Sequence, residues 1–490
     1  MSPVVTTAAG QVRGEDLGGC LRFLGIPYAT ASRFGAPGPV PGWEGVREAS
    51  DPGPMAHQNP SILDQFLGTA DWPRSEDCLR LHVWTPACDG ARRPVLVWIH
   101  GGAFTTGTPA ASWYHGESFA RRHDCVLVSV AYRLGVLGFT HLADLAGERF
   151  AASGNLGLLD QIAGLAWVRD HIAEFGGDAG NVTVFGESAG GASVLALCTA
   201  PSASGLFRRG VAMSPSVTQL RSRERASEAA EGVLRALDLG AHEAHRLLDV
   251  PVEALLDAQR SALAAGGAAN AFTAFAPTPD GTVLPEPVVP ALASGRAGAH
   301  TPLVLGATRD ELHLFTAFDP RSAQLTRAGL LQRAADLAGP RAEALVSAYE
   351  AARPGTPGQL ASSIGSDHGF RLPVVRLARA RAALGAPTWR YHFQWASPAM
   401  GGVLGACHGL DIPFAFYTLD APGVALFTGD GSDRAGVADT LHGALAAFAR
   451  SGDPGWAPYD AAEPTLLVDA TPEVVEHHES GLLAHWDGIG

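Results

Sequence analysis

The chain has 490 residues, and 46% of them are hydrophobic, which is enough for a large buried core. Its formal net charge of −14 at pH 7 disfavours nucleic acids and anionic membrane surfaces as partners. The sequence contains no lysine, so mechanisms that need a lysine base, a lysine Schiff base or a P-loop lysine are excluded.

Targeting signals and cysteine pairs are not evident. Residues 1–5 lack the basic start and apolar stretch of a secretory signal, and no apolar run reaches the ~18 residues of a membrane-spanning helix. The six cysteines are scattered without the paired spacing of a disulfide framework or a metal site. No linker divides the chain. We therefore expect one cytoplasmic domain over residues 1–490, with no membrane partner.

Strands and helices alternate in the first half of the chain. Residues 95–99 and 125–130 are continuous apolar runs of β-forming residues, which is typical of strands buried on both faces. Residues 156–174 carry apolar side chains at helical spacing, and residues 182–185 and 210–214 follow as strands. This alternation predicts an α/β fold with a mostly parallel sheet.

The second half is richer in helices. Residues 220–265 and 325–385 are rich in alanine, leucine, arginine and glutamate at helical spacing, and they predict helical excursions that flank the sheet. Residues 302–306 and 388–395 are expected to add strands, and residues 437–450 to form a helix.

Ser188 is the candidate nucleophile. It lies in the pentapeptide Gly-Glu-Ser-Ala-Gly at residues 186–190, directly after the strand at residues 182–185 and before an apolar helix at residues 192–200. A Gly-x-Ser-x-Gly turn between a strand and a helix exposes the serine hydroxyl. The helix N-terminus then favours negative charge beside it.

A serine nucleophile needs a base, a group that orients the base, and donors for the oxyanion. Glu311 follows the strand at residues 302–306 and His408 comes later, which is the order of acid and histidine in α/β-hydrolases. Asp310 is the rival acid, but adjacent side chains on extended backbone point in opposite directions. We therefore expect Glu311 to orient His408.

A loop of small residues supplies candidate oxyanion donors. Residues 100–104, His-Gly-Gly-Ala-Phe, directly follow the strand at residues 95–99. The backbone N–H groups of this loop can converge with that of Ala189 on a developing oxyanion. Glycine is needed because a side chain there would block the approach of the substrate to the backbone.

Further motifs occur in the order found in one enzyme family. The sequence resembles the type-B carboxylesterases, the family of the cholinesterases and the bacterial para-nitrobenzyl esterases, over nearly its whole length. The segments that carry this resemblance are residues 23–29, 33–34, 43–45, 75–79, 132–135, 154–161, 175–178, 186–190, 309–311 and 408–409.

The resemblance implies an α/β-hydrolase fold, with a mostly parallel central sheet flanked by helices and additional helical excursions. It also implies a serine carboxylic-ester hydrolase that needs no cofactor and no metal. By position, Ser188 would be the nucleophile, His408 the general base and Glu311 its orienting acid. The implied partner is a small-molecule ester, and a monomer or homodimer is expected. The oxyanion hole would be formed by Gly102, Ala103 and Ala189.

Other positions acquire roles through the same resemblance. Glu187 would face the pocket, where it would tune His408, contact the substrate or act as a supporting hydrogen-bonded carboxylate. Ser214 would form a hydrogen bond near the acid–histidine pair, or simply pack. Phe104 and Phe315 are the pocket candidates, with ordinary core as the alternative.

Two pairs of charged residues match structural ion pairs of the family, namely Arg33 with Glu76 and Arg133 with Asp160. Their expected role is to fix the scaffold. The chain departs from the family at Leu312, where a glycine usually follows the acid.

Two histidine motifs lie outside this constellation. Residues 242–245, His-Glu-Ala-His, place their histidines three apart, whereas the zinc motif places them four apart. Residues 476–479, Glu-His-His-Glu, are interpreted as surface. Acyl transfer to an alcohol, or amide or carbamate hydrolysis, is the alternative reaction on this scaffold. A non-catalytic cholinesterase-like binding module is the remote alternative, because such relatives usually lack the serine that this chain keeps.

Overall fold

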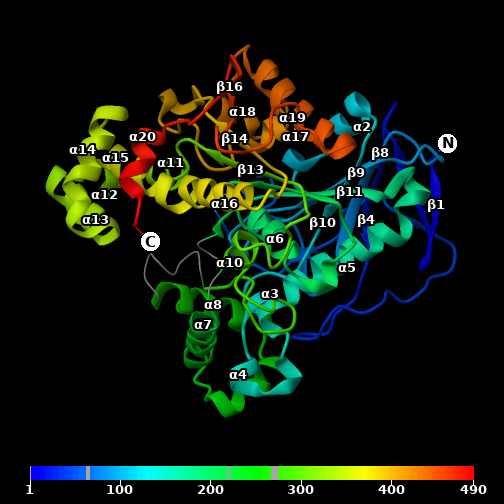
Figure 1. Cartoon of the computed structure of the whole chain (residues 1–490). Coiled ribbons are helices and arrows are strands. Elements are labelled where there is room, and N and C mark those ends of the chain that lie inside the picture. The colour runs from blue at the N-terminus through cyan, green and yellow to red at the C-terminus, as the bar shows by residue number, and fades with distance from the viewer. Residues whose placement is uncertain are drawn as a thin grey trace.

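The computed structural model describes residues 2–61, 64, 67–217, 220, 222–265 and 274–489. Its centre is an 11-stranded sheet with the strand order β16-β15-β14-β13-β12-β11-β9-β10-β8-β4-β3 (Figure 1). The strands from β15 through β10 in this order pair parallel, and the strands beyond them at both edges pair antiparallel. The predicted α/β fold with a mostly parallel sheet is confirmed.

The strands of the large sheet are β3 (Glu15–Asp16), β4 (Leu21–Pro27), β8 (Arg80–Thr85), β9 (Arg93–Ile99), β10 (Val126–Val130), β11 (Gly177–Glu187), β12 (Arg209–Met213), β13 (Leu303–Thr308), β14 (Thr388–Phe393), β15 (Thr465–Val468) and β16 (Glu473–Val475). Two smaller sheets contain β1 (Val4–Thr7), β2 (Gly10–Arg13) and β5 (Val46–Glu48), and β6 (Met55–Ala56) and β7 (Arg74–Ser75).

The helices are α2 (Glu117–His123), α3 (Gly135–Phe139), α4 (Ala143–Ala146), α5 (Leu156–His171), α6 (Ala189–Leu197), α7 (Arg223–Ala236), α8 (Val252–Ala265), α10 (Val288–Ala293), α11 (His313–Thr316), α12 (Pro320–Ala323), α13 (Arg327–Ala338), α14 (Ala342–Ala352), α15 (Pro357–Ser366), α16 (Leu372–Ala383), α17 (Ile412–Phe416), α18 (Val424–Thr428), α19 (Arg434–Ser451) and α20 (Ser480–Leu483).

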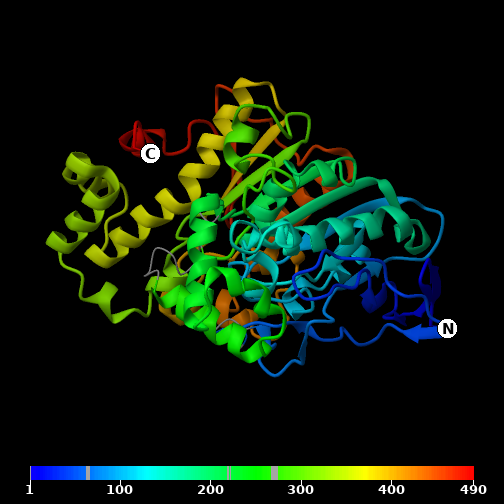
Figure 2. The same cartoon turned by 90° about the horizontal axis from the view of Figure 1, so that it is seen from below.

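Helices cover both faces of the sheet, and the central strands are therefore buried on both sides. In β9, Val95, Val97 and Ile99 belong to one hydrophobic core, whereas Leu96 and Trp98 belong to a second. Helices α5, α6, α10 and α16 contribute to the first core, and α2, α17 and α19 to the second. Figures 1 and 2 show the resulting layers of helix, sheet and helix.

A separate group of helices, α13, α14 and α15, lies at one side of the molecule next to α20 (Figure 1). These helices share a third core with the C-terminal segment, which contributes Leu482, Leu483 and Trp486. This group includes most of the helical excursion predicted for residues 325–385. None of the helices in the described residues is long and apolar enough to cross a membrane.

The element boundaries near the pentapeptide differ from the prediction. The helix begins at Ala189 rather than residue 192 and ends at Leu197 rather than residue 200, and β11 extends back to Gly177. The predicted start was too late because Gly190 and Gly191 have a low intrinsic helix propensity. The helix therefore begins directly after Ser188.

Candidate active site

Ser188 lies at a sharp turn between β11 and α6, with φ 59° and ψ −120°, a conformation that residues with a Cβ rarely adopt. Such strain persists only where the surrounding structure enforces it, and it is concentrated at functional sites. A Cβ on Gly186 would lie 2.5 Å from Gly190, and a Cβ on Gly190 would lie 2.0 Å from the carbonyl oxygen of Ile99. Both glycines are therefore needed for this elbow.

His408 and Glu311 meet in the interior. His408 Nδ1 lies 2.5 Å from Glu311 Oε2, and both side chains are buried. The N–H of Thr308 donates a 2.8 Å hydrogen bond to Oε1 of the same carboxylate, and the N–H of His408 donates one of 3.2 Å to the carbonyl oxygen of Glu311. The backbone thus fixes the carboxylate, and the carboxylate fixes the imidazole.

Asp310 has different partners. Its carboxylate pairs with Arg309 at 2.8 Å and accepts a 2.9 Å hydrogen bond from the N–H of Ala406. The two adjacent acidic side chains therefore diverge, although both lie in the turn after β13 rather than on the extended backbone that was expected. Of these two carboxylates, it is that of Glu311 that contacts the imidazole of His408.

The other ring nitrogen of His408 faces Glu187, with Nε2 3.1 Å from Oε1. Burial by itself would lower the pKa of His408, but the carboxylates of Glu187 and Glu311 outweigh it and raise this pKa to about 9. Burial raises the pKa of Glu187 to about 8, although the imidazole opposes this shift. The structure thus places Glu187 in direct contact with the candidate base.

The hydroxyl of Ser188 has a different neighbour. Its Oγ lies 3.1 Å from the Oγ of Ser216, which is buried, and the N–H of Ser216 donates to the carbonyl oxygen of Ser188 at 3.2 Å. Sequence reasoning missed Ser216, because no motif marks a serine at this distance from the pentapeptide. Among the described residues, the Ser188 hydroxyl and the His408 imidazole form no hydrogen bond with each other.

The expected hydrogen bond of Ser214 is not found. Its hydroxyl is buried and has no hydrogen-bond partner in the part of the chain that the structure describes. Ser214 directly follows β12 and has a positive φ of 40°. This conformation leaves Ser216, two residues further along the chain, beside the nucleophile. Packing, the alternative for Ser214, agrees with the structure.

The candidate oxyanion loop lies beside Ser188. Gly102 and Ala103 adopt positive φ values of 107° and 54° in a tight turn after β9. A Cβ on Gly101 would lie 3.2 Å from the Cβ of Ser188. Within the described residues, the backbone N–H groups of Gly102, Ala103 and Ala189 donate no hydrogen bond to another group. These three donors are therefore available to a ligand.

Two aromatic rings contact the imidazole of His408. The ring centroid of Phe315 lies 5.8 Å from the imidazole centroid, and that of Phe370 lies 4.9 Å from it. Phe315 was a pocket candidate, whereas Phe370 lies in a stretch whose pattern indicates only a helix. Phe104 is fully buried and packs edge to face on Phe139 at 5.0 Å, in agreement with the ordinary-core alternative.

A further buried carboxylate, that of Asp411, lies near this site. Asp411 accepts a 2.8 Å hydrogen bond from the hydroxyl of Tyr391. Burial raises the pKa of Asp411 to about 7. Its negative charge also helps to raise the pKa values of Glu187 and His408. A single aspartate three residues after the histidine carries no motif that sequence analysis could use.

Both predicted ion pairs form. Arg133 and Asp160 are joined at 2.7 Å and are buried, and the N–H of Arg133 also donates to the same carboxylate. Arg33 and Glu76 are joined at 2.5 Å nearer the surface. Leu312, the departure from the family, donates its N–H to the Oγ of Ser366 at 2.9 Å.

The surface interpretation of residues 476–479 is wrong for the second half of this segment. His478 and Glu479 are half-buried, and their ligand atoms lie within 4.8 Å of one another and of His392. Such a group has the composition of a metal site. The long-range partners of Glu479 could not be read from the sequence.

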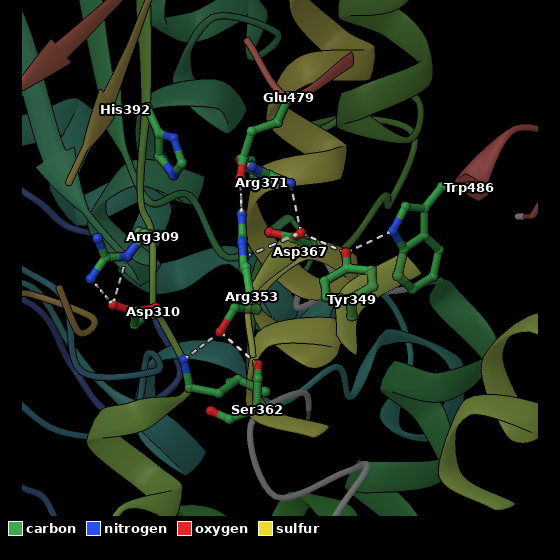
Figure 3. A network of polar contacts seen from close by, with 12 residues as sticks. Arg309, Asp310, Tyr349, Arg353, Ser362, Asp367, Arg371, His392, Glu479 and Trp486 are labelled. Atoms are coloured by element: carbon green, nitrogen blue, oxygen red, sulfur yellow. Dashed lines mark hydrogen bonds and ion pairs between the residues drawn. The ribbon is translucent and has the colours of Figure 1, made fainter. Parts of the chain in front are cut away.

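This cluster is nevertheless unsuited to a cation. The carboxylate of Glu479 is paired with both Arg353 and Arg371 (Figure 3). Burial, followed by the charges of nearby arginines, lowers the pKa of His478 to about 3. The positive potential that disfavours a proton here also disfavours a metal ion. We therefore assign no metal to it.

Comparison with known proteins finds relatives along the chain. The profile of the carboxylesterase family matches residues 1–481. The chain is 36% identical over 492 residues to the para-nitrobenzyl esterase of Bacillus subtilis (strain 168), with 97% of each chain covered. It is 37% identical over 493 residues to the phenmedipham hydrolase of Pseudarthrobacter oxydans, with 95% of this chain and 94% of the relative covered.

The fold agrees with these matches. The solved structure of a Geobacillus stearothermophilus carboxylesterase superposes with a TM-score of 0.87 at 39% sequence identity, and 99% of both chains is covered. The chain therefore belongs to the carboxylesterase family, and it is a serine carboxylic-ester hydrolase with an α/β-hydrolase fold.

Proposed function

We propose that Ser188, His408 and Glu311 form the catalytic triad of this esterase. The observation that carries the proposal is the buried 2.5 Å contact between His408 Nδ1 and Glu311, in a chain whose Ser188 stands at a strained elbow. Glu187 connects the elbow to the His408–Glu311 pair, because it directly precedes Ser188 in the chain and its carboxylate lies 3.1 Å from His408 Nε2. Catalytic hydrogen bonds are often misaligned before substrate binds, so a shift of the imidazole from Glu187 to Ser188 completes the triad.

In the proposed reaction, His408 Nε2 accepts the proton of Ser188 as Oγ attacks the carbonyl carbon of the ester. The oxyanion accepts hydrogen bonds from the N–H groups of Gly102, Ala103 and Ala189. His408 then donates the proton to the departing alcohol, which leaves an acyl group on the serine. Water, activated by the same imidazole, releases the acid and restores the enzyme.

Ser188→Ala tests this assignment. The variant should lose about 10⁴–10⁶ in kcat on p-nitrophenyl acetate, because it lacks the nucleophile. It should also fail to react with a fluorophosphonate probe. Ser204→Ala, on an exposed serine, is the matched control and should keep wild-type rates. Ester turnover at the wild-type rate in Ser188→Ala would overturn the assignment.

The proposed substrates are small esters with a bulky apolar or aryl group. Phe315 and Phe370 support this class, because both rings lie against the imidazole that must reach the scissile bond. The similarity to a para-nitrobenzyl esterase agrees with it. A series of p-nitrophenyl esters of increasing acyl length measures the preference. A steady fall in kcat/KM from acetate onward would contradict a bulky acyl group.

We also propose that the chain is one domain that works in the cytoplasm as a monomer or homodimer. The large sheet takes strands from residue 15 to residue 475, which supports a single unit. All six cysteines are free thiols, and free thiols persist in a reducing compartment. Cell fractionation tests the location, and light scattering after gel filtration measures the oligomeric state.

A further inference from the structure

Helices α15 and α16 are joined by a π-helical turn at Asp367–Arg371. The dihedral angles stay helical across both junctions, so the two helices and the turn form one continuous helix. A π turn inserts an extra residue into a helix, and such turns are often found at functional sites. In this chain the turn carries Phe370, the ring that lies 4.9 Å from the imidazole of His408.

The two ends of the turn are anchored by a buried polar network (Figure 3). Asp367 accepts hydrogen bonds from Arg371 at 2.6 Å and from the hydroxyl of Tyr349 at 2.5 Å. Arg371 also pairs with Glu479, whose carboxylate lies 2.8 Å from Arg353. Asp367 and Arg371 are fully buried, so loss of one charge leaves its partner uncompensated.

Glu479 brings the C-terminal segment into this network. It precedes α20 with φ 53°, a left-handed conformation that is unfavourable for a residue with a Cβ. Further along, Trp486 donates from its indole Nε1 to the hydroxyl of Tyr349 at 2.9 Å, and its ring lies 5.5 Å from that of His368 in the π turn. The C-terminal segment thus holds the turn from one side.

The same helix contacts the turn of the catalytic acid. Ser366, the last residue of α15, accepts the N–H of Leu312 at 2.9 Å, and Leu312 directly follows Glu311. One continuous helix therefore contacts the residue after the acid through Ser366 and the base through Phe370.

We propose that Arg371 is a positioning residue, whose ion pairs with Asp367 and Glu479 lock the π turn so that Phe370 is held against His408 as a wall of the substrate pocket. This inference rests on the proposed function, because the wall matters only where His408 acts on the substrate. A large acyl group packs on the wall, whereas an acetyl group needs little of it. Loosening the turn should therefore raise KM for large acyl groups and leave kcat for acetate unchanged.

The experiment compares p-nitrophenyl octanoate with p-nitrophenyl acetate in Glu479→Gln and Arg371→Lys. Lysine keeps the charge of Arg371 but lacks the planar fork that reaches two carboxylates. Both variants should lose about tenfold in kcat/KM on octanoate, mainly through KM, because an apolar pocket contact is worth a factor of this size. On acetate the change should stay below about twofold. Phe370→Leu, which alters the wall itself, should lower the octanoate-to-acetate ratio of kcat/KM in the same direction.

Glu350→Gln is the matched control, because it breaks an exposed ion pair with Arg327 in the same helical group. It should leave the octanoate-to-acetate ratio unchanged. Phe370→Leu keeps every charge of the network, so it tests the wall even where a charge variant fails to fold.

The proposal is overturned if Phe370→Leu leaves the octanoate-to-acetate ratio of kcat/KM unchanged. It is also overturned if Phe370→Leu changes this ratio while the two network variants, Glu479→Gln and Arg371→Lys, keep the wild-type value. An equal loss on both esters in the network variants would also overturn it, because that result indicates a purely structural role. Ser188→Ala in the same series separates this failure from that of the triad. If Ser188→Ala retains turnover, the triad assignment is wrong. If Ser188→Ala is inactive but Glu479→Gln and Arg371→Lys keep the wild-type ratio, only the role of Arg371 is wrong.

Discussion

The hydroxyl of Ser188 lies 3.1 Å from the hydroxyl of Ser216, whereas the imidazole expected beside it faces Glu187. Both groups of the proposed proton transfer thus have other partners in the resting enzyme. In the proposed mechanism, His408 Nε2 leaves Glu187 and the Ser188 hydroxyl turns from Ser216. If that mechanism holds, we expect the resting contacts to stabilise the ground state against the first chemical step.

Ser216→Ala tests this interpretation. Removal of a neutral hydrogen bond worth about 0.5–1.5 kcal/mol from the ground state should speed acylation by about 2–10-fold. The rate of inactivation by a fluorophosphonate measures the reactivity of Ser188 without binding of an ester. Ser216→Thr keeps a hydroxyl and is the control. A loss of more than about tenfold in Ser216→Ala would show that Ser216 assists the transition state instead.

The pH dependence of kcat/KM should reflect the carboxylates around His408. The base must be neutral to accept a proton, and its neutral fraction grows as the pH rises through its pKa. Since that pKa is raised from 6.5 to about 9, kcat/KM should still be rising at pH 8 and level off only above about pH 9. The measurement is a kcat/KM profile from pH 5 to 10. A plateau reached near pH 7 would contradict the raised pKa.

Glu187→Gln should move this profile. The variant removes the carboxylate that contributes most to the raised pKa of His408, so the acid limb should shift to lower pH. Glu174→Gln, at an exposed position, should leave the profile in place. An acid limb that stays at the wild-type pH in Glu187→Gln would show that Glu187 does not control the base.

The features that were predictable from the sequence have local causes. The alternation of buried strands and helices follows from apolar periodicity, and the elbow at Ser188 follows from glycines that its backbone requires. The choice of Glu311 over Asp310 assumed extended backbone, but both residues lie in the turn after β13, so the choice agrees with the structure whereas its reason does not. Each inference depends on neighbours within a few residues along the chain.

The features that were not predictable depend on how distant segments meet. The contact of Ser216 with the nucleophile depends on a positive φ at Ser214, which no residue preference indicates. Phe370 reaches the imidazole through a π turn, and a pattern with a period of 3.6 residues does not reveal an inserted residue. The partners of Glu479 are Arg353, directly after α14, and Arg371 in the π turn, both more than a hundred residues earlier in the chain.

Gly102→Ala tests the oxyanion loop. Gly102 has φ 107°, and a Cβ there would lie 2.1 Å from the carbonyl oxygen of Thr106, so the loop must shift. Displacement of a backbone donor should cost about 10²–10³ in kcat. Gly443→Ala, where a Cβ meets open space in α19, is the control and should keep wild-type activity. Wild-type kcat in Gly102→Ala would exclude Gly102 from the oxyanion hole.

Asp160→Asn tests the contribution of the buried ion pair to stability. Arg133 and Asp160 are joined at 2.7 Å with side chains that are 6% and 0% exposed, so the variant leaves a buried guanidinium without its counter-charge. The free energy of unfolding should fall by about 3–5 kcal/mol. Asp170→Asn breaks the exposed pair with Arg169 and should cost less than about 1 kcal/mol. Urea unfolding followed by circular dichroism measures both, and equal losses would show that burial adds nothing to the strength of the pair.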